Sequence, residues 1–450
     1  MRILFILILI GSFPAKSIAL EVLNHKNGST VRYPLVLLRG TCFGDLSIQD
    51  GAITPVRSKD LFKALVPLKP GRNEIKMVDK MEEGIFTLTY LPQKNPYYIR
   101  VIWLTDKSGA TEYATPENGE PQNYIGRLQT AAQLMQTFTA EKMSDLALGK
   151  RTFRLERDPE SHDVVVHTLK GHLSADEYYK LGESGEYWNT VYQWLNREYP
   201  DPFAKNIVLA AFTRKDPATG KMKGHTALGG GNLGLFGSAS VFTWPESIEK
   251  ISEAFFNERI VDPARVHNDG AGRDTYWGVA STTIGATLHE MGHTFGLPHC
   301  TDRFGIMTRG FDHFHRAFTF SDPPSRRNFL RKFFTLEEEA YFAPVSATFL
   351  DWSPWFQIDR ETPFKTSEEP TIVSEGNVYI FRSKSGVNWV GIWSGDNIHD
   401  YIITDQETEF RVSRSELDGR LEGKPLSRVS AIAGNGRHRV FHISEPASTQ

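Results

Sequence analysis

The sequence predicts an α+β protein, with a central domain containing long helices between two β-rich domains. Short runs of β-branched and aromatic residues, separated by turn residues, fill the chain up to about residue 113. Apolar residues then recur at helical spacing over 125–143, and a second helical pattern covers about 277–295. After residue 371 the β-like runs return. A chain of 450 residues has room for two or three such domains.

Residues 1–19 have the pattern of a secretory signal peptide. Met1-Arg2 precedes an apolar run over 3–10, and Ser17-Ile18-Ala19 offers small residues where a signal peptidase reads them. We therefore expect cleavage after Ala19 and a secreted, extracellular protein, or a periplasmic one if the source is bacterial. The alternative is an uncleaved anchor. No later stretch approaches the roughly 20 apolar residues of a membrane-spanning helix, so no stable membrane insertion is expected.

Residues 20–115 are predicted to form a β-sandwich domain. Strand-like runs occur at 31–38, 75–78, 86–90 and 97–104, and turn residues separate them. No helical period of useful length interrupts them. A polar stretch over 115–121 then reads as a linker to the next domain.

Residues 116–360 are predicted to form the central, catalytic domain. Ser174 and Glu177 have the spacing of a capping box, so a helix should begin there and continue, with a break at 182–185, to about 199. A buried strand is expected at 206–212 and an edge strand beside a cleft at 233–244. Further helices are expected at 247–257 and, in part, at 335–352. Residues 365–450 should form a smaller β-rich domain.

The overall composition is that of an ordinary globular protein, with 40% hydrophobic and 23% charged residues. The formal net charge is −3, so no basic surplus indicates a nucleic-acid partner. The two cysteines, Cys42 and Cys300, could pair with each other or stay free. The oligomeric state stays open.

The chemistry is concentrated in residues 289–299, which read His-Glu-Met-Gly-His-Thr-Phe-Gly-Leu-Pro-His. His289 and His293 are four residues apart, so a helix places both imidazoles on one face, where they can bind one Zn²⁺. Glu290 cannot share their ligand position and is placed to take a proton from a zinc-activated water.

The end of this motif supplies a third ligand. Gly296 can adopt the left-handed backbone that ends a helix, and Pro298 makes its continuation unfavourable. The turn can then return His299 to the same metal. Three protein ligands with one open position are typical of catalytic zinc. The alternatives are a buried helix with satisfied histidines and an inactive relic.

These residues resemble the metzincins, zinc metallopeptidases whose motif is His-Glu-x-x-His-x-x-Gly-x-x-His followed by a Met-turn. The resemblance implies a metzincin-like zincin fold for the central domain and places the Met-turn at Met307, eight residues after His299. Met307 would then pack beneath the metal. The sequence is more similar to a little-studied family of putative zinc metallopeptidases of fungi and animals, through residues 289–299, 305–307 and 309–312.

We therefore expect a secreted zinc-dependent metalloendopeptidase that hydrolyses protein or peptide substrates with Glu290 as general base. The rival interpretation is a catalytically silent, zinc-stabilised module that binds glycan or protein through its β-domains.

Three weaker signals stay open. His313 and His315 either line the cleft or belong to a polar surface loop. Cys42 faintly suggests a latency thiolate. Residues 229–235 either pair with extended substrate or form a flexible loop.

Overall fold

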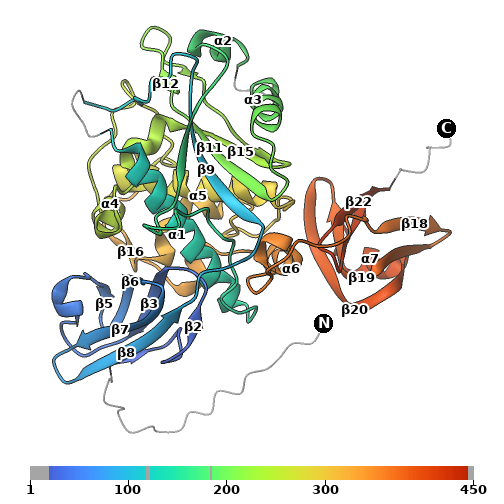
Figure 1. The fold of residues 1–450 in the computed structure, drawn as a ribbon, viewed down its shortest axis with the longest axis horizontal. Coiled ribbons are helices and arrows are strands. Elements are labelled where there is room, and N and C mark those ends of the chain that lie inside the picture. Colours follow the sequence, from blue (N-terminus) through green and yellow to red (C-terminus); the bar gives the residue numbers. More distant parts are fainter. Residues whose placement is uncertain (1–19, 118–121, 183–184, 444–450) are drawn as a thin grey trace.

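The computed structural model describes residues 20–117, 122–182 and 185–443, so the signal-peptide prediction for residues 1–19 lies outside the described part. The protein has a mixed α/β architecture with several separate sheets (Figure 1). An amino-terminal pair of sheets packs below a central layered domain, and a β-rich unit lies at the carboxyl end. Among the described residues, no helix combines the length and the apolar character needed to cross a membrane.

Two four-stranded sheets form the amino-terminal sandwich, in the orders β1-β3-β6-β5 and β2-β8-β7-β4. Apolar side chains from both sheets share one core, for example Val36 and Leu38 with Ile75 and Leu88. Strand β3 is buried on both faces, because Val36 and Leu38 enter the sandwich core while Leu35 and Leu37 pack against the central domain. The strands are β1 (Glu21–Val22), β2 (Thr30–Val31), β3 (Leu35–Thr41), β4 (Ser47–Ile48), β5 (Val56–Ser58), β6 (Leu61–Pro67), β7 (Gly71–Val78) and β8 (Glu83–Tyr90).

The strand predicted at 97–104 does not belong to this sandwich, and that part of the prediction is wrong. It is β9 (Tyr98–Thr105), which pairs in parallel with β10 (Val166–Lys170) on one side and β11 (Ala204–Ala210) on the other. Its residues from Val101 to Leu104 are all buried, which is the pattern of a strand covered on both faces.

The central sheet has the order β10-β9-β11-β15-β14, and only the edge strand β14 (Ala227–Gly230) runs antiparallel to its neighbour. Helices α1 (Tyr124–Asp145) and α5 (Tyr276–Thr294) share a core with one face of the sheet. Helices α2 (Ala175–Lys180) and α3 (Gly185–Glu198) cover the other face. The predicted capping box is confirmed, because Ser174 and Glu177 exchange both hydrogen bonds at the start of α2.

One further prediction for the central domain is wrong. Strand β15 (Leu233–Gly237) is an interior strand followed by a 3₁₀ helix (Ser238–Thr243), so 233–244 is not one edge strand. The helix expected in part of 335–352 is confirmed as α6 (Pro344–Trp352), which begins at a proline, a residue suited to the first helical turn. Other elements are α4 (Ile251–Phe255), β12 (Arg214–Lys215), β13 (Met222–Lys223), β16 (Ser321–Asp322) and β17 (Lys332–Phe333).

The carboxyl-terminal unit is β-rich, as predicted. Its strands are β18 (Thr371–Glu375), β19 (Val378–Ser394), β20 (Asn397–Ser413), β21 (Arg428–Ala433) and β22 (His438–His442), with helix α7 (Arg414–Gly419). The long strand β19 pairs with β18, β20 and β21. Residues Trp389, Trp393 and Ile398 are buried in the same core as α5, so this unit packs directly on the central domain.

Candidate metal and catalytic site

Helix α5 carries the motif across the middle of the molecule (Figure 1). Thr275 caps its first turn by accepting a hydrogen bond from the Gly278 backbone N–H. The helix ends after Thr294, and Gly296 takes a φ of +94°, which favours glycine. The Leu297 N–H then donates back to the Gly292 carbonyl at 3.1 Å, and the chain reverses toward the helix.

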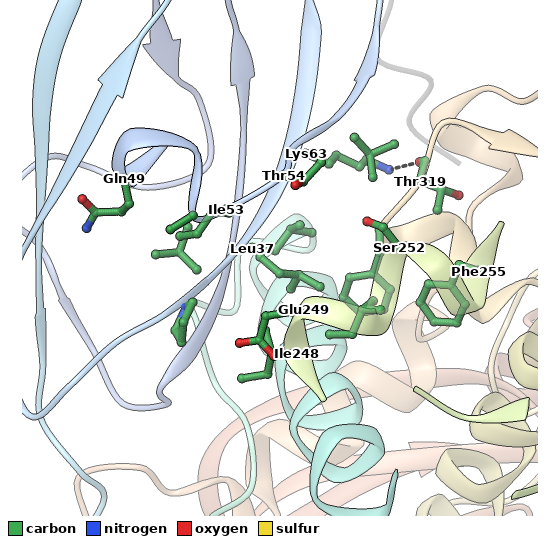
Figure 2. A pocket seen from close by; sticks show the side chains of 17 residues that line it. Leu37, Gln49, Ile53, Thr54, Lys63, Ile248, Glu249, Ser252, Phe255 and Thr319 are labelled. Atoms are coloured by element: carbon green, nitrogen blue, oxygen red, sulfur yellow. Dashed lines mark hydrogen bonds between the residues drawn. The ribbon is translucent and has the colours of Figure 1, made fainter. Parts of the chain in front are cut away.

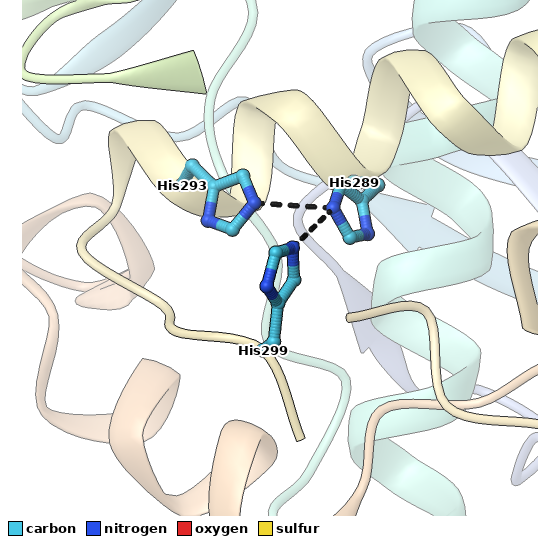
Figure 3. A group of neighbouring side chains, drawn as sticks. All are labelled: His289, His293 and His299. Atoms are coloured by element: carbon cyan, nitrogen blue, oxygen red, sulfur yellow. Dashed lines mark hydrogen bonds between the residues drawn. The ribbon is translucent and has the colours of Figure 1, made fainter. Parts of the chain in front are cut away.

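This reversal brings the three predicted ligands together. Figure 3 shows the rings of His289, His293 and His299 pointing toward one another. The Nε2 atom of His289 lies 3.1 Å from that of His293 and 3.3 Å from that of His299. Two ligand atoms of a tetrahedral zinc with bonds of 2.0–2.1 Å lie about 3.3 Å apart. The donor set and its spacing therefore fit zinc.

Backbone carbonyls hold two of these rings in the required orientation. The Nδ1 atom of His289 lies 2.8 Å from the Ile306 carbonyl oxygen, and that of His293 lies 2.8 Å from the Leu297 carbonyl oxygen. A proton on Nδ1 leaves Nε2 with a lone pair directed at the metal position. Burial lowers the pKa of His289 to about 3 and also lowers that of His293, which favours the neutral, metal-binding form.

Met307 lies beneath the same stretch of α5. It is buried, and its Sδ would be 2.5 Å from a Cβ atom placed on Gly292, so only glycine at 292 allows this approach. On the neighbouring side, the ring of Phe311 packs edge-on against His289 with centroids 5.2 Å apart. The segment that follows the third histidine thus packs Met307 against α5 and Phe311 against His289.

Glu290 follows the first ligand and is 8% exposed. Burial raises the pKa of its carboxyl to about 7, and the hydrogen bond from the Gly229 backbone N–H opposes this rise. A cation bound nearby would lower that pKa, because it favours the carboxylate. Gly229 belongs to the edge strand β14, so this edge and α5 meet at the predicted base.

The contact at Gly229 leaves no room for a side chain. A Cβ atom there would lie 2.0 Å from the Glu290 carbonyl oxygen, whereas one at Gly230 would meet only Trp188, at 3.7 Å. We expect Gly229→Ala to push β14 away from α5 and to lower the rate of substrate cleavage about 10- to 100-fold, because small displacements of a catalytic group are costly. Gly230→Ala is the matched control and should cleave normally. Equal rates for both variants would contradict the expectation.

The carboxyl-terminal unit touches the third ligand, which the sequence did not indicate. His299 forms an isolated parallel bridge with Asn397, and the Ile398 N–H donates to the His299 carbonyl oxygen at 3.1 Å. Phe349 of α6 packs against both Trp389 and His438, with ring centroids 5.4 and 4.9 Å apart. The start of β20 therefore supports the loop that carries His299.

Removing this support should weaken metal binding. Ile398→Pro deletes the N–H that holds the His299 carbonyl, whereas Ile398→Val keeps it. We expect the proline variant to bind zinc about 10-fold more weakly, since loss of groups that orient ligands typically costs that much, and the valine variant to bind normally. Competition with a chromogenic chelator measures the affinity. Unchanged zinc affinity in Ile398→Pro would show that the contact does not hold the ligand.

The weaker candidates lie elsewhere. His315 lies in the 3₁₀ helix Arg309–Ala317, is fully buried and bonds to Ser281 and Asp322, so neither the cleft nor the surface-loop prediction holds for it. His313 lies beside Arg273, 3.4 Å from its guanidinium. Both cysteines are free thiols: Cys42 is buried in the sandwich core, away from the histidines, and Cys300 lies 3.2 Å from the Thr308 hydroxyl.

A cavity of about 400 Å³ lies between the sandwich and the central domain, apart from the histidines (Figure 2). Its walls are mostly apolar, with Leu37 and Ile53 facing Ile248 and Phe255. The one buried cation there, Lys63, donates to the carbonyls of Arg316 and Thr319 and to the carboxylate of Glu339. These three acceptors use all three N–H donors of the ammonium group. Lys63 therefore has no donor left for a ligand in the cavity.

Two known proteins to which the chain is similar are named as zinc proteins, in agreement with a group of three histidines that can hold zinc. The chain is 27% identical over 351 residues to a putative zinc metalloproteinase of Schizosaccharomyces pombe, covering 72% of this chain and 56% of the relative. It is 26% identical over 342 residues to a putative zinc metalloproteinase of Saccharomyces cerevisiae, covering 66% of this chain and 49% of the relative. The chain thus spans about half the length of the curated relatives it matches.

Among solved structures, the chain is similar to catalytically inactive OgpA of Akkermansia muciniphila in complex with an O-glycopeptide substrate. The identity is 17% and the TM-score 0.48, over 78% of this chain and 93% of that one. Zinc is the cofactor named for the curated relatives, and the three histidines can hold it. The family model described as "Putative peptidase family" matches residues 19–388 of the 450, and the chain therefore belongs to that peptidase family.

Proposed function

We propose that this protein is a zinc-dependent metalloendopeptidase. The observation that carries the proposal is the convergence of three histidine Nε2 atoms beside a buried glutamate that is not one of the ligands. Among the described residues, no fourth His, Cys, Asp or Glu joins the group. A structural zinc normally has four protein ligands, so a group of three favours a catalytic site.

The histidines and Glu290 have separate roles in the proposed reaction. Zinc, when bound, supplies a Lewis acid that polarises the scissile carbonyl and makes water a better nucleophile. His289, His293 and His299 would hold it, and Met307 would support them from below. Glu290 takes the proton of the attacking water and passes it to the leaving amine. The Gly229 N–H fixes one side of the carboxylate for this transfer.

The edge strand β14 supports a peptide as the substrate. It is the last strand in its sheet and lies against α5 at Glu290. An extended peptide can add to such an edge through backbone hydrogen bonds with little demand on sequence.

The proposal includes a metzincin-like zincin arrangement of the central domain, for which the sheet, α5 and the turn at Met307 are the support.

The test is cleavage of a denatured protein mixture by the purified chain, with the new termini mapped. We expect cuts that disappear on chelation and return when zinc is added back. Absence of cuts by a folded, zinc-loaded chain would contradict the proposal and favour the rival, in which zinc only stabilises a module that binds through its β-domains.

We also propose that the protein is exported, on the support of the signal-peptide pattern in residues 1–19. Expression with this segment should place a mature chain beginning at Leu20 outside the cytoplasm. Retention of the full segment on a chain inside the cell would contradict export.

A further inference from the structure

The loop joining β16 to β17 presents an unusual surface. Residues 326–333 form an unbroken run of exposed positions. Phe329 and Leu330, with 81% and 77% exposure, are the two most exposed large apolar side chains in the described part of the chain. Phe333 and Leu336 follow at 63% and 68%. Apolar groups of this size exposed together usually mark an interaction site.

Cations accompany these apolar side chains. Between Pro323 and Leu336 the sequence contains no acidic residue and four basic ones, Arg326, Arg327, Arg331 and Lys332. The chain as a whole carries a net charge of −3, so this concentration is local. A surface that combines protruding apolar groups with arginine and lysine is suited to a bilayer with anionic headgroups.

The existing partners of these cations do not prevent such binding. Arg326 lies 3.4 Å from Asp274, Arg331 lies 3.6 Å from Glu258, and Lys332 lies 2.7 Å from Glu338. All three basic side chains are between 44% and 59% exposed. Exposed pairs of this kind contribute little and can exchange for phosphate groups.

The base of the loop is held firmly, so the tip is presented in a fixed place. The Trp277 indole N–H donates to the Pro324 carbonyl at 3.0 Å, which ties the loop to the start of α5. Ser325 and Asn328 exchange backbone hydrogen bonds at 2.8 and 3.2 Å, and this turn precedes the exposed Phe329. A preformed tip binds a surface without first being ordered.

We propose that the β16–β17 loop, together with β17, is a peripheral docking site for an anionic lipid surface, with Phe329, Leu330 and Phe333 entering the interface and the four cations contacting headgroups. Strand β16, where the loop begins, lies beside the sandwich in Figure 1, and Lys63 of β6 lies 4.8 Å from the ring centroid of Phe320, the residue before β16. This docking does not depend on the proposed peptidase activity.

The test is co-flotation of the full chain with vesicles of phosphatidylcholine alone or mixed with phosphatidylglycerol. We expect binding to the anionic vesicles that weakens as salt is added. The double variant Phe329→Ser, Leu330→Ser should bind on the order of 100-fold more weakly, because two large apolar groups no longer enter the interface. The matched control replaces Met81 and Ile403, which are 71% and 56% exposed elsewhere, by serine and should bind normally.

Two outcomes would overturn the proposal. One is no flotation of the folded wild-type chain with either kind of vesicle. The exposed loop would then be interpreted as a surface that binds a protein partner. The other is equal loss of binding in the loop variant and in the Met81, Ile403 control. Because Glu290→Gln should float like the wild type, failure of docking and failure of the proposed catalysis are separable.

Discussion

Replacing Glu290 by glutamine should reduce cleavage by about 10²- to 10⁴-fold, the usual contribution of a general base. Glutamine has nearly the same shape and can still accept the Gly229 N–H, but its amide cannot take a proton from water. Zinc content should stay at the wild-type value, because the proposed ligands are the three neighbouring histidines. The measurements are the rate at which new termini appear and the bound metal per chain.

The control for this variant is Glu253→Gln, an exposed carboxylate on α4 that pairs with Lys250. It should cleave at the wild-type rate. Cleavage by Glu290→Gln at that same rate would remove Glu290 from the mechanism. Loss of zinc together with activity would show that Glu290 maintains the site instead of acting on water.

The largest effect on stability should come from Glu141, which joins α1 to the sandwich. Its carboxylate is 1% exposed and lies 2.6 Å from Lys150 Nζ, 2.7 Å from Asn24 Nδ2 and 3.1 Å from the Tyr33 hydroxyl. Glu141→Gln leaves the buried Lys150 without its counter-charge. We expect the free energy of unfolding to fall by about 3–5 kcal/mol, measured by thermal or denaturant unfolding.

The exposed pair again provides the control, since Glu253→Gln should change the free energy of unfolding by about 1 kcal/mol or less. The effect of Glu141 should also depend on pH. Hydrogen bonding and nearby cations outweigh desolvation and hold the pKa of Glu141 well below its ordinary value of 4.5. Its stabilisation is therefore complete above about pH 4.5 and is lost as the pH falls further.

The difference in unfolding midpoint between wild type and Glu141→Gln should accordingly narrow below pH 4.5. A difference that stays constant down to low pH would show that packing, not charge, is the source of the effect. No difference at neutral pH would show that this buried carboxylate does not hold the sandwich to α1.

Local patterns predicted the parts of the fold that depend on near neighbours. The helix at 277–295 and the capping box at Ser174 appear as α5 and α2 because helical period and caps act over a few residues. Strand β9 was misplaced because a run of strand-forming residues does not reveal its partners. Whether a strand joins a sandwich or a central sheet is decided by residues far along the chain.

The same distinction applies to the site. The three histidines and Glu290 lie within eleven residues, so helix geometry and one glycine turn were enough to bring them together. The Gly229 N–H at Glu290 and the Ile398 N–H at the His299 carbonyl come from distant segments. A triple glycine at 229–231 was the only sign of the first contact, and nothing in the sequence indicated the second.

The most direct test of the central claim is X-ray absorption spectroscopy of the zinc-loaded protein, which reports the atoms around the metal. We predict three imidazole nitrogens and one light-atom ligand that the protein does not supply, and loss of one imidazole in His299→Ala. A shell of four protein ligands, or a spectrum unchanged by His299→Ala, would contradict an open catalytic position at His289, His293 and His299.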